Sequence, residues 1–254
     1  MKPSSLLSAS FWAVVLFCFA SCGNQNNTSA TTDSTTTTTD TATSTSTTAA
    51  STPSPAASTI TTTPQNMLVV RHKVANFNKW LASYEAHDSM RLASGVHSYV
   101  IGRGAKDSNL VQVALKVDDI NKAKAFAKNP SLKQAMQKGG VIGAPTINFT
   151  TMTYQDTANI NTDLRSRTTF MVKDWDKWQR LFDSSRQMRK DNGIMDRAYG
   201  HDVDNNHKVT VVVALLDTAK AYAFWKSDSL KKWQTSAGLT SQPERWLYRI
   251  VKRY

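Results

Sequence analysis

The stretch Val74-Ala75-Asn76-Phe77-Asn78-Lys79-Trp80 returns later in the chain as Val172-Lys173-Asp174-Trp175-Asp176-Lys177-Trp178. At this offset of 98 positions the match continues without an insertion, for example from Met90-Arg91 to Met188-Arg189. Roughly twenty identities in one gapless run are hard to obtain by chance. The chain therefore contains two tandem copies of one module.

Each copy carries the same order of expected elements. In the first copy a strand at 67–74 leads into a helix at 76–93, and strands follow at 96–103 and 111–117. The last of these alternates apolar Val111, Val113 and Leu115 with other residues, as a half-buried strand does. Asp119 is placed to cap a second helix, which breaks near 129–130 and ends at 139–140 before a strand at 146–154 (244–253 in the second copy). The order β-α-β-β-α-β predicts an α+β, ferredoxin-like fold in each repeat.

The two repeats are expected at 66–156 and 165–254, joined by a linker at 157–164. A ferredoxin-like unit has helices on one face of its sheet, so the other face needs a cover. Two copies in one chain can cover each other as an intrachain pseudo-dimeric α/β barrel, which makes a monomer. The alternative, in which each copy pairs with another chain, stays open at this stage.

Two features resemble a known superfamily. They are the Trp-bearing first helix that ends in Met-Arg, and the stretch Phe126-Ala127-Lys128-Asn129-Pro130-Ser131-Leu132-Lys133. Together with the element order, they resemble the dimeric α/β-barrel proteins related to antibiotic-biosynthesis monooxygenases. The resemblance implies the fold of nearly all of both repeats. It leaves the activity open, because the superfamily includes cofactor-free monooxygenases, haem-handling enzymes, isomerases and proteins of unknown role.

The amino terminus has the pattern of an export signal. Lys2 precedes an apolar run from Leu6 to Ala20, which is short for a membrane span, and Phe19-Ala20-Ser21-Cys22 follows the pattern of a bacterial lipobox. This resemblance implies a signal peptide at 1–21, a lipid on Cys22 and anchoring in the bacterial cell envelope. No acidic cluster follows Cys22, which favours the periplasmic side. Residues 22–65 are rich in Thr and Ser and are expected to form a disordered tether.

The candidate catalytic residues lie on the first helix. His87 continues the apolar stripe of Phe77 and Tyr84, and Arg91 follows one turn later. A nearby guanidinium disfavours the charged imidazole, which would suit a general base. The alternative is a helix-end histidine that is partly buried and hydrogen-bonded. His72 alternates with Val70 and Val74 and is interpreted as a histidine at the edge of the core.

A second set of candidates lies on strand faces opposite the aliphatic ones. If the aliphatic faces pack on the helices, these mixed faces line the barrel interior and form a ligand site. The residues are His97, Tyr99, Arg103 and Gln112 from the first repeat, and Arg197, Tyr199 and Thr210 from the second.

Composition restricts the remaining possibilities. The net charge of +12 would favour acidic partners, but the lysines are spread along helix faces and no nucleic-acid motif is present. No metal site or cofactor motif is recognisable. The sequence therefore predicts an envelope lipoprotein that binds a small apolar or aromatic ligand in the barrel interior. Two alternatives are a cofactor-independent monooxygenase-like or haem-handling enzyme, and an interaction protein that binds acidic envelope polymers through a basic face.

Overall fold

The computed structural model describes residues 58–254. The first repeat comprises β2 (Gln65–Val74), α1 (Phe77–Ala86), α2 (Asp88–Leu92), β3 (Val96–Gly104), β4 (Leu110–Val117), α3 (Ile120–Ala127), α4 (Pro130–Lys138) and β5 (Val141–Asp156). The second comprises β6 (Leu164–Met171), α5 (Trp175–Ser184), α6 (Arg186–Asp191), β7 (Ile194–Asp202), β8 (Lys208–Leu215), α7 (Thr218–Lys226), α8 (Asp228–Ser236) and β9 (Glu244–Arg253). The predicted β-α-β-β-α-β order is confirmed in both repeats.

Six of the eight helices in the described part of the chain begin at a side-chain cap; the exceptions are α2 and α6, which follow the breaks described below. Asn76 and Asp174 accept hydrogen bonds from the backbone N–H groups of Lys79 and Lys177, and Asp119 and Asp217 cap α3 and α7 in the same way. These caps satisfy backbone donors that the first turn of a helix leaves free.

The single helix expected at 76–93 is in fact two helices, α1 and α2, and α5 and α6 repeat this break. At the breaks, His87 Nδ1 lies 2.6 Å from Ser83 O, and Ser185 Oγ donates to Leu181 O at 2.7 Å. A side chain that bonds the carbonyl four residues earlier competes with the helical backbone bond and bends the helix.

Each repeat forms an antiparallel sheet with its helices on one face. The strand orders are β5-β2-β4-β3 and β9-β6-β8-β7. Aliphatic residues of the central strands and aromatic residues of the helices form one core in each repeat, around Trp80 in the first and Trp178 in the second.

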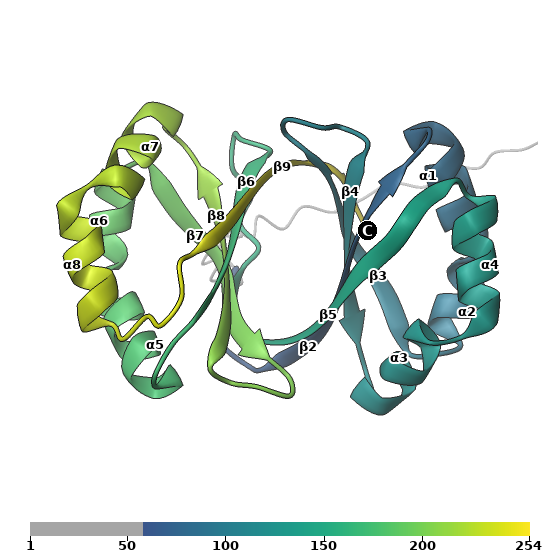
Figure 1. Cartoon of the computed structure of the whole chain (residues 1–254), viewed down its shortest axis with the longest axis horizontal. Helices are drawn as coiled ribbons and strands as arrows, with labels where there is room; N and C mark the ends of the chain where they lie inside the picture. Colours follow the sequence, from purple (N-terminus) through teal and green to yellow (C-terminus); the bar gives the residue numbers. More distant parts are fainter. Residues whose placement is uncertain (1–57) are drawn as a thin grey trace, which may run out of the picture. The chain divides into compact units, whose positions relative to one another are not determined.

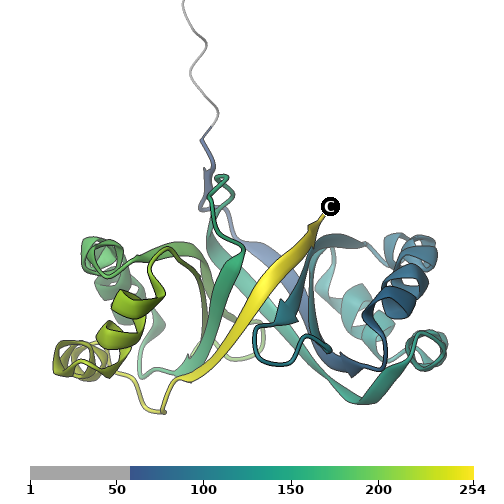
Figure 2. The same cartoon turned by 90° about the horizontal axis from the view of Figure 1, so that it is seen from above.

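Two seams join the sheets. β3 pairs with β9 and β5 pairs with β7, both antiparallel, so that eight strands close into a barrel with helices on its outside (Figures 1 and 2). Gly102 lies against the Tyr248 ring at the first seam, and Gly200 against the backbone of Thr151 and Met152 at the second. The chain thus has the predicted pseudo-dimeric barrel within itself.

The expected tether boundary needs a correction. Ile60–Thr61 forms a short strand, β1, which pairs with Gln155 and Asp156 of β5. Thr59 Oγ1 also donates to Asp156 at 3.1 Å. Residues 59–65 therefore belong to the folded part, because the end of β5 offers them an edge to pair with. The expected signal peptide, Cys22 and most of the tether lie outside the described residues.

Within residues 58–254, no helix has the length and apolar character that crossing a membrane requires.

Candidate functional site

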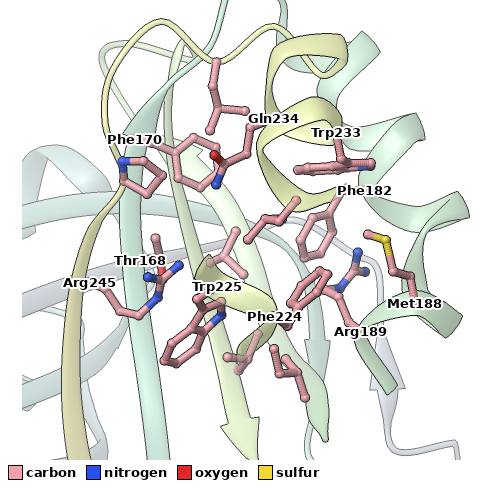
Figure 3. A pocket seen from close by; sticks show the side chains of 16 residues that line it. Thr168, Phe170, Phe182, Met188, Arg189, Phe224, Trp225, Trp233, Gln234 and Arg245 are labelled. Atoms are coloured by element: carbon pink, nitrogen blue, oxygen red, sulfur yellow. The ribbon is translucent and has the colours of Figure 1, made fainter. Parts of the chain in front are cut away.

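A mostly apolar pocket lies between the helices and the sheet of the second repeat (Figure 3). It encloses about 80 Å³. Strands β6, β7, β8 and β9 and helices α5 to α8 contribute its walls, and most of its lining is aromatic or aliphatic. The lining residues used below are Thr168, Phe170, Phe182, Arg189, Phe224, Trp225, Trp233, Gln234, Leu239 and Arg245.

Helical spacing builds the aromatic wall. On α5, Trp175, Trp178 and Phe182 stack in sequence, with ring centroids 5.3 and 4.8 Å apart, because residues three and four apart share a helix face. Phe182 then meets Trp233 of α8 edge to face at 6.3 Å. Such rings supply large, flat apolar surfaces to the pocket.

A buried ion pair fixes one side of the pocket. Arg189 Nε and Nη2 donate to the two carboxylate oxygens of Asp196 at 2.7 and 2.6 Å, and Arg189 Nη1 donates to Ser185 Oγ. The guanidinium lies 3.5 Å from the centre of the Phe182 ring. All of its donor nitrogens are therefore engaged, and Arg189 supports the aromatic wall.

The opposite side carries polar groups that remain available. The Arg245 guanidinium lies 4.0 Å from the centre of the Trp225 ring, and Figure 3 shows it near Thr168. Among residues 58–254, no acidic side chain forms a salt bridge with Arg245. Gln234 contributes an amide from α8. This side can bind an anionic or hydrogen-bond-accepting group.

The first repeat contains the equivalent pocket, also of about 80 Å³, with a different lining. His72 and Tyr84 stand where the second repeat has Phe170 and Phe182, and Ala127 stands in place of Trp225. His72 is 4% exposed, neither ring nitrogen has a hydrogen-bond partner, and burial lowers the pKa of its imidazole to about 4. The imidazole is therefore neutral at neutral pH, in keeping with its interpretation as a core-edge histidine.

The two predicted catalytic residues make different contacts, and of the two only Arg91 lines the first-repeat pocket. His87 bonds Ser83 O at the helix break and belongs to the lining of neither pocket. Arg91 donates to Tyr84 O at 2.6 Å and to Asp88 at 2.9 Å, and it lies over the Tyr84 ring. Its charge is thus paired with Asp88. The general-base role of His87, with Arg91 as its cationic neighbour, stays a prediction.

Of the predicted ligand residues, Tyr99, Gln112 and Arg197 line a cavity inside the barrel. Three others do not: His97 pairs with Asp118 at the surface, Arg103 lies over the Phe77 ring of α1, and Tyr199 is in the second core and donates to Asp183. Thr210 is buried on β8 at the position equivalent to Gln112.

β-Bulges explain the misplacement of Arg103 and Tyr199. The register shifts between Ser98 and Val100 in β3 and between Asp196 and Ala198 in β7. A bulge adds one residue to a strand, so every later side chain changes face. The expected alternation holds up to Tyr99 and Arg197 and is reversed beyond them.

Several polar residues of the barrel interior were not predicted from the sequence. Arg165, Arg167, Tyr248 and Arg253 line the same cavity as Tyr99. A signal was available, since Arg165 and Arg167 alternate with Ser166 and Thr168 at the start of a strand.

Comparisons with known proteins bear on the fold. No family model matches the sequence, and no curated protein matches it. A heme-binding protein from Thermus thermophilus gives 7% identity and a TM-score of 0.47, over 76% of this chain and 94% of that one. An anthrone oxidase-like protein of known structure is 10% identical, with a TM-score of 0.53, over 75% of this chain and 92% of that one. The fold is thus that of the dimeric α/β barrels, closed here by one chain.

The two helix–sheet pockets do not suit haem. The pocket of the second repeat has no His, Cys or Tyr in its lining, and such side chains are the usual axial ligands. The first-repeat pocket offers His72 and Tyr84, but about 80 Å³ is well below the roughly 300–1,000 Å³ of typical ligand pockets. Residues 58–254 also contain no group of three or more His, Cys, Asp or Glu side chains suited to a metal ion.

Proposed function

We propose that this protein binds a small aromatic ligand with an anionic or hydrogen-bond-accepting substituent in the helix–sheet pocket of its second repeat. The observation that carries the proposal is the aromatic lining of this pocket, with one unpaired arginine, Arg245, at its side. Ligand pockets are typically apolar with a few polar groups that fix orientation.

The difference between the repeats supports this choice of pocket. Trp225 and Trp233 stand where the first repeat has Ala127 and Ala135, and Arg245 stands in place of Ile147. Neither tryptophan is needed to close the barrel, since the first repeat lacks both. Their presence points to a surface for stacking a flat ligand.

The size of the pocket limits the ligand. An engineered apolar cavity that binds benzene has about 150 Å³, whereas this pocket encloses about 80 Å³. A single-ring ligand therefore requires an outward movement of half-buried side chains such as Trp225 and Trp233. The proposed site is thus in the helix–sheet pocket, and not in the barrel interior that the sequence favoured.

We also propose that the lipid on Cys22 anchors this binding protein in the cell envelope. The support is the lipobox pattern alone, because Cys22 lies outside the described residues. No catalytic role is part of the proposal, since the candidate His87 lines neither pocket.

The test is calorimetric titration with benzoate, a single ring with one anionic group. Leu239→Trp fills the pocket, and Val141→Trp makes the same change at the equivalent position of the first repeat. Because the added indole occupies the space that the benzoate ring needs, Leu239→Trp is expected to weaken benzoate binding roughly tenfold or more, about 1.4 kcal/mol. Val141→Trp is expected to bind like the wild type. Equal affinity in both variants would place the site elsewhere.

A further inference from the structure

The barrel interior contains a cavity of about 90 Å³ that is distinct from the helix–sheet pockets. Its lining includes four arginines and one carboxylate, that of Asp156. All four arginines come from the second repeat: Arg165, Arg167, Arg197 and Arg253. The cavity is therefore strongly basic.

Three of these arginines are buried, with exposed fractions of 2% for Arg165, 8% for Arg167 and 7% for Arg197. Arg197 pairs with Asp156 at 3.3 Å and donates to Ala158 O. Arg165 donates to the backbone oxygens of Thr162 and Leu164, which leaves its charge without a counter-ion. Arg253 is exposed at the end of β9.

Arg167 is the least satisfied of the group. Its Nε is buried without any hydrogen-bond partner among residues 58–254, and none of the salt bridges there includes it. Burial lowers the pKa of its guanidinium, and burial lowers that of Arg165 to about 10, helped by the nearby charges of Arg197 and Arg253. Both groups are nevertheless charged, because the guanidinium of arginine is not deprotonated in proteins. A buried charge without a partner is costly, so an anion in the cavity would stabilise the protein.

The fold itself does not require these charges. The equivalent residues of the first repeat are Met67, Val69, Tyr99 and Gln155, which are uncharged and line the same cavity. Both sets of residues occupy corresponding strand positions of one closed barrel. The arginines of the second repeat are therefore an addition to a barrel that uncharged side chains can also fill.

We propose that the barrel interior binds a small oxyanion, such as phosphate or sulfate, held by the guanidinium groups of Arg165 and Arg167. The planar guanidinium presents paired N–H donors that match the oxygens of such anions. Tyr248 and Gln112 add polar groups to the same lining. This site is separate from the proposed aromatic pocket, so either one can fail without the other.

The barrel cavity lies next to two outer clefts with which it shares lining residues. The cavity shares Tyr99 and Gln155 with an outer cleft of about 500 Å³, which β1 and the residues after it border. The exposed Arg253 lines the cavity as well. Arg253 also lines an outer cleft of about 780 Å³, so it connects the basic wall of the cavity with the surface.

The test measures phosphate binding to the purified full chain by calorimetry. It also compares the midpoint of thermal unfolding of the protein in phosphate and in sodium chloride of equal ionic strength. Arg167→Met removes the unpartnered guanidinium, and Arg180→Met removes the same charge from the exposed face of α5. We expect phosphate to raise the midpoint of the wild type and of Arg180→Met beyond chloride. In Arg167→Met, phosphate binding should weaken at least about tenfold, because a hydrogen-bonded charge is lost.

Without phosphate, Arg167→Met should unfold at or above the wild-type temperature, since it no longer buries an unpaired charge. Should it fail to fold, Arg253→Met provides the second variant, because its exposed side chain can be replaced without disturbing the core; it should also weaken phosphate binding. Two results would overturn the proposal. One is an equal thermal midpoint of the wild type in phosphate and in chloride; the other is an unchanged phosphate affinity in Arg167→Met, or in Arg253→Met where that variant replaces it.

Discussion

Position 72 and its counterpart 170 show how a single residue distinguishes two copies of the same core. His72 and Phe170 both pack beside a tryptophan of the first helix, with ring centroids 5.3 and 5.6 Å apart. The imidazole leaves two buried nitrogens without partners, and the phenyl ring leaves none. The histidine therefore makes the first repeat sensitive to acid.

Replacing His72 by Phe should remove this sensitivity. The pKa of His72 is about 4 in the folded protein, against 6.5 for an ordinary histidine, so the unfolded chain binds a proton first as the pH falls. Stability is then lost below pH 6.5, by about 2 kcal/mol at pH 5 from this group alone. Urea unfolding at pH 7 and pH 5 should show a smaller loss in His72→Phe than in the wild type. An unchanged loss would mean that His72 is protonated in the folded state.

In the second repeat, the buried Arg189–Asp196 pair is expected to be needed for stability. Asp196→Asn leaves a buried guanidinium without its charged partner, which costs about 3–5 kcal/mol. The control is Asp228→Asn, which breaks an exposed pair with Lys231 and should cost less than about 1 kcal/mol. Similar unfolding free energies for the two variants would show that Asp196 does not neutralise Arg189.

At the scale of elements, the sequence predicted what local periodicity controls. The alternation of Val111, Val113 and Leu115 and the aromatic stripe from Phe77 to Trp80 placed the strands, the helices and most of the core. The breaks at His87 and Ser185 and the bulges at Tyr99 and Arg197 were not predicted, because side-chain competition and extra strand residues leave no periodic trace. The bulges are also why Tyr199 and Arg103 were assigned to the wrong face.

The two seams depend on strands that approach closely. A Cβ on Gly200 would overlap the backbone of Thr151 and Met152 in β5, so Gly200→Ala should part the β5–β7 seam. The expected loss is about 3 kcal/mol or more, at the upper end of overpacking costs. Gly143→Ala has open space but a φ of 71°, and should cost about 1–2 kcal/mol. Denaturant unfolding that ranks Gly143→Ala as the more harmful change would contradict this view of the seam.

At the scale of the whole molecule, the duplication predicted the closed barrel because each sheet needs a cover. The duplication could not predict which repeat supplies each proposed site. The residues Arg165, Arg167, Trp225 and Arg245 occur in the second repeat alone and break the symmetry. The first repeat contributes uncharged side chains at the matching positions, whereas the second supplies the aromatic pocket and the basic wall.

The proposed anchor is tested by lysing cells and separating the membrane pellet from the supernatant. Cys22→Ser removes the thiol that would carry the lipid, and should move the protein from the membrane pellet to the supernatant after lysis. Cys18→Ser, inside the expected signal peptide, should leave it in the pellet once the signal is cleaved. A pellet that retains Cys22→Ser would contradict lipid anchoring at this residue.

Closure of the barrel by one chain is the central claim, because both proposed sites lie in a molecule whose two repeats cover each other. Native mass spectrometry of residues 58–254 tests this claim directly. We predict a monomer at all concentrations, since β3–β9 and β5–β7 leave none of the eight barrel strands unpaired at an edge. A stable dimer that dissociates only on unfolding would contradict the claim and would mean that each repeat pairs with another chain.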